Sequence, residues 1–135
     1  MILRHLTLLQ NIALSHDLLW VDEHSWSPVI ANVEYSLTGA LIVESATRLA
    51  GRHITLQAPD AEMAWHIRST VDLLRSWCAT PGQQFLLTLD DMRSFTVMFR
   101  HHEAPAMEST PVSGFATYDA DDYWQVTLKF MEVIA

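Results

Sequence analysis

Residues 85–99 read FLLTLDDMRSFTVMF, and this stretch decides the fold class. Large apolar side chains occupy every second position on either side of two aspartates, which is the pattern of strands with one buried face. These positions are Phe85, Leu87 and Leu89 before the aspartates and Phe95, Val97 and Phe99 after them. Because Asp90 and Asp91 favour turns, the stretch predicts a β-hairpin.

The same alternation recurs toward both ends of the chain. Residues 33–47 predict either a hairpin with its turn at Gly39 or one long strand bent at that glycine. Further strands are expected in residues 2–9, 18–20 and 54–57, near Met107, and in residues 124–131. The first of these segments also fits a short helix.

One helix is expected over residues 61–77. Apolar side chains recur there at helical spacing, and they are Ala64, Ile67, Val71, Leu74 and Cys78. Asp60 suits the N-cap position, because its carboxylate can accept hydrogen bonds from first-turn amides. The apolar stripe should therefore pack against a sheet.

This order of strands, one helix and more strands predicts an α+β fold that is mainly β. We expect a β-barrel or a sandwich of antiparallel strands with one flanking helix, because a doubly wound sheet needs repeated strand-helix alternation. A mass of 15.4 kDa suits a single domain over residues 1–135. Its expected irregular parts are an N-terminal segment of about 1–30 and a long loop of about 101–122.

Composition excludes several classes of partner. The chain has 16 acidic and 8 basic side chains, a formal net charge of −8. Phosphate binding needs clustered Lys and Arg, so no sequence-specific nucleic-acid binding is expected. No apolar run approaches the roughly 20 residues of a membrane-spanning helix, and no membrane partner is expected. The single cysteine, Cys78, excludes an internal disulfide.

No pattern of catalytic or metal-binding residues stands out. The seven histidines include no His-Glu-x-x-His pair. Ser15, His16 and Asp17 are consecutive, so they cannot form a triad, which needs residues from separate elements. The acidic cluster that begins at Asp119 lacks the Gly and Glu of a calcium-binding loop. We therefore expect no enzyme activity, no cofactor and no metal.

Four segments together resemble small tail proteins of bacteriophages and prophages. They are GRHITLQ (51–57), AWHIRSTVDLLRSW (64–77), FLLTLDDMRSFTVMFRH (85–101) and YWQVTLKFMEV (123–133). Their order and spacing are similar to those of distal-tail and tail-tube components, over residues 35–133. This resemblance implies a split β-barrel with one flanking helix. The N-terminal 30 residues match no pattern of this kind.

The resemblance implies a structural virion protein that self-assembles into a tail ring or baseplate. Rings of such proteins are hexameric, and the implied partners are further copies and other tail proteins. The implied location is the virion tail, after assembly in the bacterial cytoplasm. The family carries no catalytic residues. A monomeric binding module, or a tail-assembly chaperone or adaptor, is the alternative function.

Candidate interface residues come from the two segments with the weakest strand pattern. The long loop holds apolar side chains that need cover, and aromatic side chains in the N-terminal segment could anchor a neighbour. The candidates are Met107, Val112, Phe115, Tyr118, Trp20 and Trp26. If the loop serves assembly alone, removing residues 104–113 should leave the fold intact.

Overall fold

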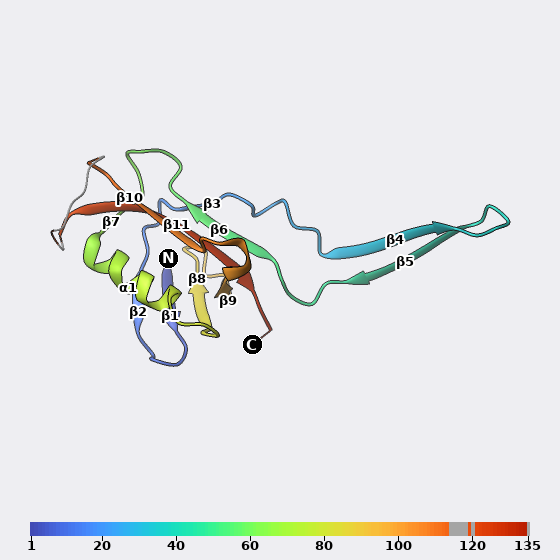
Figure 1. Cartoon of the computed structure of the whole chain (residues 1–135), viewed down its shortest axis with the longest axis horizontal. Coiled ribbons are helices and arrows are strands. Elements are labelled where there is room, and N and C mark those ends of the chain that lie inside the picture. Colours follow the sequence, from blue (N-terminus) through green and yellow to red (C-terminus); the bar gives the residue numbers. More distant parts are fainter. Residues whose placement is uncertain (114–118, 120, 135) are drawn as a thin grey trace.

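The longest strand, β11 (Tyr123–Glu132), runs through the middle of a nine-stranded antiparallel sheet (Figure 1). On one side it pairs first with β7 (Trp65–Ile67) and then with β6 (His53–Gln57). On the other side it pairs first with β10 (Met107–Pro111) and then with β9 (Ser94–Phe99). The sheet therefore forks at β11. The computed structural model describes residues 1–113, 119 and 121–134.

Four further strands complete this sheet. Beyond β9 lie β8 (Phe85–Thr88), β1 (Ile2–His5) and β2 (Asn11–Ala13), and beyond β6 lies β3 (Leu19–Trp20). The β8–β9 pair is the hairpin expected from residues 85–99, and it is confirmed with Phe85 opposite Val97. The strands expected near Trp20, near Met107 and at the C-terminal end are confirmed as well.

A second sheet stands apart from the first. It consists of β4 (Val29–Tyr35) and β5 (Leu41–Thr47), paired from Val29 opposite Thr47 to Tyr35 opposite Leu41. The hairpin alternative for this segment is therefore confirmed, and the single bent strand is wrong. This hairpin, which we call the arm, projects far from the rest of the chain, which we call the body (Figure 1).

The core lies between the body sheet and the only α-helix of the described residues, α1 (Arg68–Cys78). Alternate residues of the body strands point into it, as the period of two requires. Examples are Leu3, Ile54, Leu56, Phe85, Leu87, Val97, Leu128 and Phe130, all completely buried. The helix contributes Val71, Leu74 and Trp77, so the expected packing of its stripe on a sheet is confirmed for Val71 and Leu74.

The helix begins later than the expected residue 61, and the reason is a pairing distant in sequence. Residues of β7 form a ladder with the start of β11, which fixes them as strand. Ala64 adopts the left-handed region, with φ of 59°, which a helix cannot include. The Asp60 carboxylate does accept from an amide, that of Glu62 at 2.8 Å, but it closes a turn before β7.

The fold class is confirmed as α+β and mainly β, with antiparallel sheets and one helix. The described strands do not close into a barrel. The N-terminal segment is more regular than expected, because it holds three strands of the body sheet. The segment expected as a long loop begins with a short 3₁₀ helix (His101–Glu103), and its β10 is the strand expected near Met107.

Removing residues 104–113 should therefore unfold the body, contrary to the expectation from the sequence. The deletion takes away β10, which pairs with β11 along five positions, and the buried side chain of Ala106. Far-UV circular dichroism and thermal melting of the deletion variant check this. A cooperative melt at the wild-type temperature would show that β10 is dispensable.

Candidate interaction surface: the β4–β5 arm

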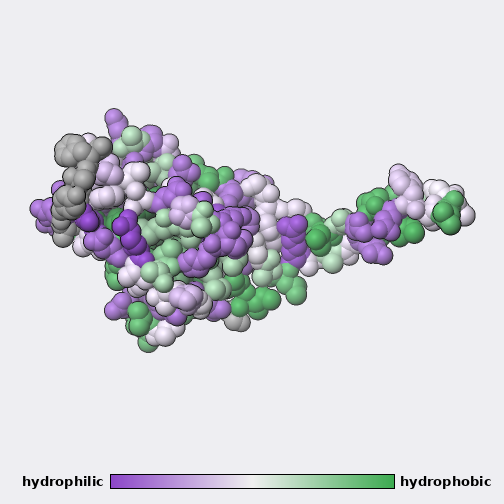
Figure 2. Space-filling view, in the orientation of Figure 1, coloured by the Kyte–Doolittle hydropathy of each residue, from purple (hydrophilic) through white to green (hydrophobic). Residues whose placement is uncertain are grey.

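Every residue of both arm strands is exposed to solvent. Figure 2 shows apolar side chains along the arm, outside the body. The large ones are Val29, Ile30, Val33, Tyr35, Leu41, Ile42 and Val43. An isolated two-stranded hairpin is marginally stable in water, and exposed apolar surface of this extent marks an interaction site. The arm is therefore the strongest candidate for a functional surface.

The register gives the arm two different faces. Residues directly opposite each other on antiparallel strands point to the same side, and neighbours along a strand point to opposite sides. One side holds Val29, Ala31, Val33, Tyr35, Leu41, Val43, Ser45 and Thr47, and we call it the uncharged face. The other side holds Ile30, Asn32, Glu34, Ile42, Glu44 and Ala46. Both carboxylates of the arm strands thus point away from the uncharged face.

Both edges of the arm are open, because among the described residues β4 and β5 pair only with each other. Natural sheets protect open edges with Lys, Pro or bulges. Residues 29–47 contain no Lys, Arg or Pro, and their ladder is regular over all seven positions. Glu34 and Glu44 are therefore the only charged side chains in the arm strands that oppose pairing with another chain.

The tip of the arm is a defined turn. The Ser36 amide donates to the Ala40 carbonyl at 2.8 Å, and the Gly39 amide donates to the Ser36 carbonyl at 2.9 Å. Gly39 has φ of +83°, a conformation that favours glycine. The side chains of Ser36 and Thr38 also share a hydrogen bond of 2.9 Å. These bonds fix the end of the ribbon without help from a partner.

The root of the arm is tied to the body through Asp22. Its carboxylate accepts hydrogen bonds from the Thr55 amide at 2.9 Å and the Thr55 hydroxyl at 2.8 Å. Buried Arg100 donates to the same hydroxyl and lies 3.8 Å from the Asp22 carboxylate. On the outgoing side, the Gly51 amide donates to the Glu132 carbonyl at 2.8 Å. Both connections to the arm are thus anchored at the body sheet.

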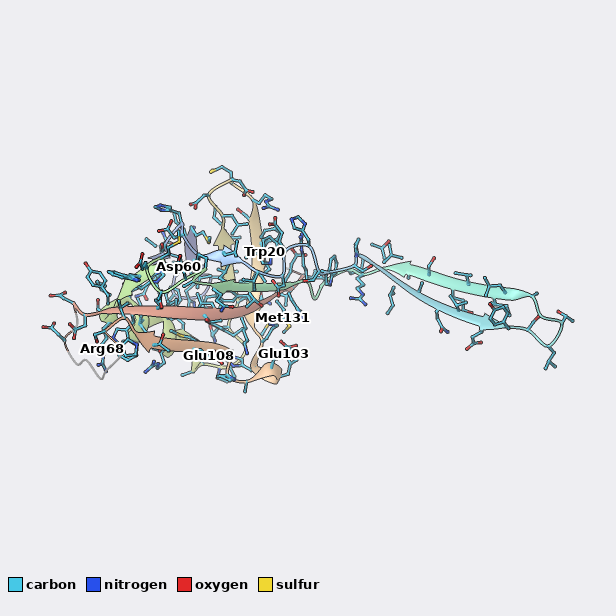
Figure 3. The ribbon with its side chains drawn as sticks, turned by 90° about the horizontal axis from the view of Figure 1, so that it is seen from above. Trp20, Asp60, Arg68, Glu103, Glu108 and Met131 are labelled. Carbon is cyan, nitrogen blue, oxygen red and sulfur yellow. The ribbon has the colours of Figure 1, made fainter. Side chains whose placement is uncertain are left out.

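Trp20 packs beneath this root. Its indole N–H donates to the His53 carbonyl at 3.2 Å, and its ring meets Phe95 edge to face. The guanidinium groups of Arg52 and Arg93 lie 4.5 and 5.6 Å from the ring centre, within the range of cation–π attraction. Figure 3 shows Trp20 in the part of the body nearer the arm, and Arg68 at the opposite end.

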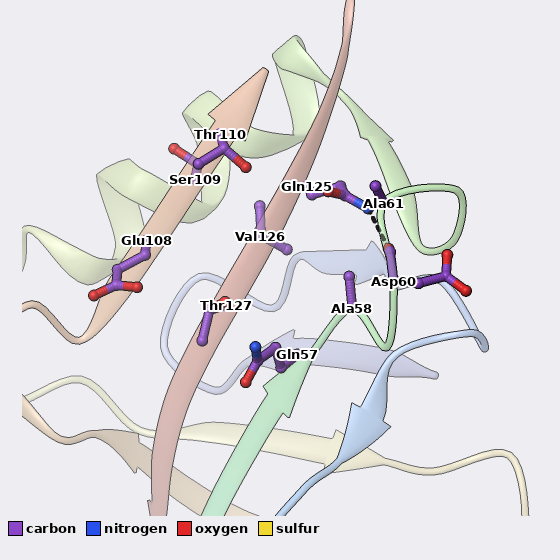
Figure 4. Close-up of a pocket in the computed structure, with 10 residues that line it drawn as sticks. All are labelled: Gln57, Ala58, Asp60, Ala61, Glu108, Ser109, Thr110, Gln125, Val126 and Thr127. Atoms are coloured by element: carbon purple, nitrogen blue, oxygen red, sulfur yellow. Dashed lines mark hydrogen bonds between the residues drawn. The ribbon is translucent and has the colours of Figure 1, made fainter. Parts of the chain in front are cut away.

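A polar groove of about 240 Å³ crosses β11 between β10 and the segment after β6 (Figure 4). Asp60, Glu108 and Gln125 are among its lining residues, and Gln125 donates to the carbonyls of Asp60 and Met63 at 2.7 and 2.9 Å. No histidine or cysteine lines it. The groove therefore offers no thiol and no imidazole.

The surroundings of Cys78 do not activate its thiol. Burial raises the pKa of the Cys78 thiol, which makes it a poor nucleophile at neutral pH. Among the residues that the structure describes, no three His, Cys, Asp or Glu side chains could hold a metal ion together. In the same part of the chain, no helix is long and apolar enough to cross a membrane.

His66 should make the fold sensitive to acid. Its Nε2 accepts a hydrogen bond of 3.0 Å from the Ser15 amide, which requires the neutral ring. Burial lowers the pKa of His66, and the nearby Ala64 backbone partly opposes that shift. The unfolded chain takes up this proton near its ordinary pKa of about 6.5. Stability should therefore fall as the pH drops from about 6.5 toward the lower folded pKa.

Urea unfolding at several pH values between about 7.5 and 5.5 checks this. The comparison variant His66→Gln keeps an acceptor but does not titrate. Its free energy of unfolding should depend less on pH than that of the wild type. Equal pH dependence in the two proteins would rule His66 out as the cause.

The structure distributes the candidate interface residues over different places. Trp20 lies in the body's own core, so it is not an exposed anchor. Met107 is half-buried on β10 against the core. Trp26 and Val112 are half-buried, and the Val112 amide donates to the Tyr123 carbonyl at 3.1 Å. Phe115 and Tyr118 lie outside the described residues. None of the six belongs to the arm.

The sequence predicts that the arm is a hairpin, but it does not predict that the arm is an exposed surface. Alternation of apolar residues predicts that one face of a strand is buried, and the simplest expectation is that it packs on the core of its own chain. The informative signal was the absence of Lys, Arg and Pro between Val29 and Thr47. That absence is ordinary for a central strand and unusual for a ribbon with two open edges.

The chain matches no protein-family model, no curated protein and no solved structure. The resemblance of its four segments to tail proteins therefore stays a prediction from the sequence.

Proposed function

We propose that this chain is a structural subunit that acts by self-assembly through its arm. The observation that supports this most is the uncharged face of the arm, which lies exposed on a ribbon with two open edges. Such a ribbon gains stability when another chain covers its apolar side chains or pairs with its edges.

The setting that we propose is the tail of a bacteriophage or prophage, as a ring or baseplate component. The order and spacing of the four tail-like segments support it, and so does the acidic composition. Negative charge around a channel for DNA avoids adhesion to phosphate groups. The proposed partners are further copies of the chain and other tail proteins. The proposed location is the virion, after assembly in the bacterial cytoplasm.

Electron microscopy of the concentrated, purified protein tests the proposal. Rings or stacks of uniform diameter are the expected result. Particles of monomer size at every concentration would contradict self-assembly and favour the alternative of a monomeric binding module or assembly adaptor.

A further inference from the structure

The body carries a second exposed apolar surface, at the end opposite the arm. Trp65 and Ile67 on β7 and Tyr123 on β11 are exposed, and so is Met63 just before β7. We call these four residues the β7 patch. Figure 1 places β7 and the start of β11 at one end of the molecule and the arm at the other. The predicted interface residue Val112 adjoins this patch through its hydrogen bond to Tyr123.

The register explains why these side chains point outward together. Ile67 stands opposite Tyr123, and Trp65 stands opposite Gln125, so these two pairs share one side of the sheet. His66, between Trp65 and Ile67, faces inward and is buried. The rings of Trp65 and Tyr123 lie 5.6 Å apart. The indole N–H of Trp65 donates to the Ala61 carbonyl at 3.1 Å. That polar group is thus satisfied within the chain, and the ring faces are left for another surface.

We propose that the uncharged face of one subunit's arm docks on the β7 patch of the next subunit. This inference rests on the proposed self-assembly and names its two contact surfaces. Both are exposed and apolar, and they lie at opposite ends of one chain, so a single type of contact covers both. A contact between two different surfaces is head-to-tail, and repetition of it produces a ring if the rotation closes.

Charge selects the uncharged face over the other face of the arm. Asp60 and Glu62 are exposed in the turn before β7, and Asp122 precedes Tyr123. Docking through the opposite face would bring Glu34 and Glu44 against these acids, and like charges in an interface are costly. The neighbouring cation Arg68 already lies 3.7 Å from Asp72 and over the Trp124 ring. Docking through the uncharged face keeps both arm carboxylates turned away from the acidic side chains beside the patch.

The size of the contact favours a closed ring over a pair. Seven residue pairs span about 24 Å at about 3.4 Å per residue, and two strands make a ribbon about 10 Å wide. The footprint is then a few hundred Å², below the roughly 800 Å² per partner of a standard stable interface. An arm-to-patch pair alone is therefore weak. A ring gives every subunit both contacts, which stabilises the assembly as a whole.

Engineered cysteines test this geometry in the Cys78→Ala background. Val33→Cys places a thiol in the middle of the uncharged face, and Ile67→Cys places one in the patch. Mild oxidation of the double variant should give a ladder of covalent dimers, trimers and higher species on a non-reducing gel. Val33→Cys alone should give almost no dimer. The matched control is Asn32→Cys with Ile67→Cys, which moves the arm thiol by one residue to the opposite face and should give no ladder.

The other outcomes separate the inference from the proposed function. Efficient dimers from Val33→Cys alone would show that arms pair with each other, which overturns the head-to-tail contact. An equal ladder from the Asn32→Cys control would overturn the choice of face. If the Cys78→Ala parent assembles in sedimentation but the double variant gives no ladder, only the inference is wrong. If the wild type and this parent are monomeric at every concentration, the proposed self-assembly fails together with it.

Discussion

Val33→Asp is expected to weaken association between subunits by at least about 30-fold, because a carboxylate buried without a partner costs about 2 kcal/mol or more. Val33 lies in the middle of the uncharged face, opposite Val43. Within the single subunit its side chain is already exposed, at 54%. The substitution should therefore spare the body fold and act on assembly alone. Sedimentation velocity over a concentration series measures the association, and thermal melting checks the fold.

Ile30→Asp is the matched control. Ile30 is equally exposed, at 53%, is also apolar and belongs to the same strand, but it lies on the face with the carboxylates. Its substitution should weaken association much less than Val33→Asp. Equal losses from the two variants would show that the faces of the arm are not distinguished, and wild-type assembly by Val33→Asp would remove the uncharged face from the interface.

Val71→Asp should cause a large loss of stability. Val71 is 1% exposed and lies in the stripe that packs α1 on the body sheet. An unpaired carboxylate there should cost about 3 kcal/mol or more. For a domain of this size, that lowers the thermal midpoint by about 10 °C.

Leu73→Asp provides the comparison on the same helix, because Leu73 is 38% exposed. Its thermal midpoint should change little. The two variants are compared by urea and thermal unfolding. A Val71→Asp midpoint within error of wild type would mean that the stripe does not form the contact between helix and sheet.

Local alternation was enough to predict most strands of the body. The β8–β9 hairpin follows from six apolar positions and two turn-forming aspartates, all within 15 residues of sequence. The start of α1 could not be predicted in this way. Residues 65–67 carry a helical pattern, but they are held as strand by the start of β11, more than 50 positions later. Pairing at that distance overrides local propensity.

The candidate surface was harder to predict for a related reason. The arm strands show the same alternation as the body strands, and the sequence does not say which chain covers an apolar face. The opposite error arose at Trp20, which was a candidate anchor for a neighbour. Its ring lies instead between Phe95 and two guanidinium groups of its own chain. Burial depends on contacts distant in sequence, which alternation does not encode.

The most direct test of the account compares the wild type with a variant in which residues 31–45 are replaced by a short Gly-Ser turn. No residue of the arm belongs to the hydrophobic core, so the variant should melt at the wild-type temperature. In sedimentation velocity, the wild type should shift from monomer to one closed oligomer as the concentration rises, and the variant should stay monomeric throughout. A wild type that stays monomeric at every concentration, or a variant that assembles as the wild type does, would contradict assembly through the arm.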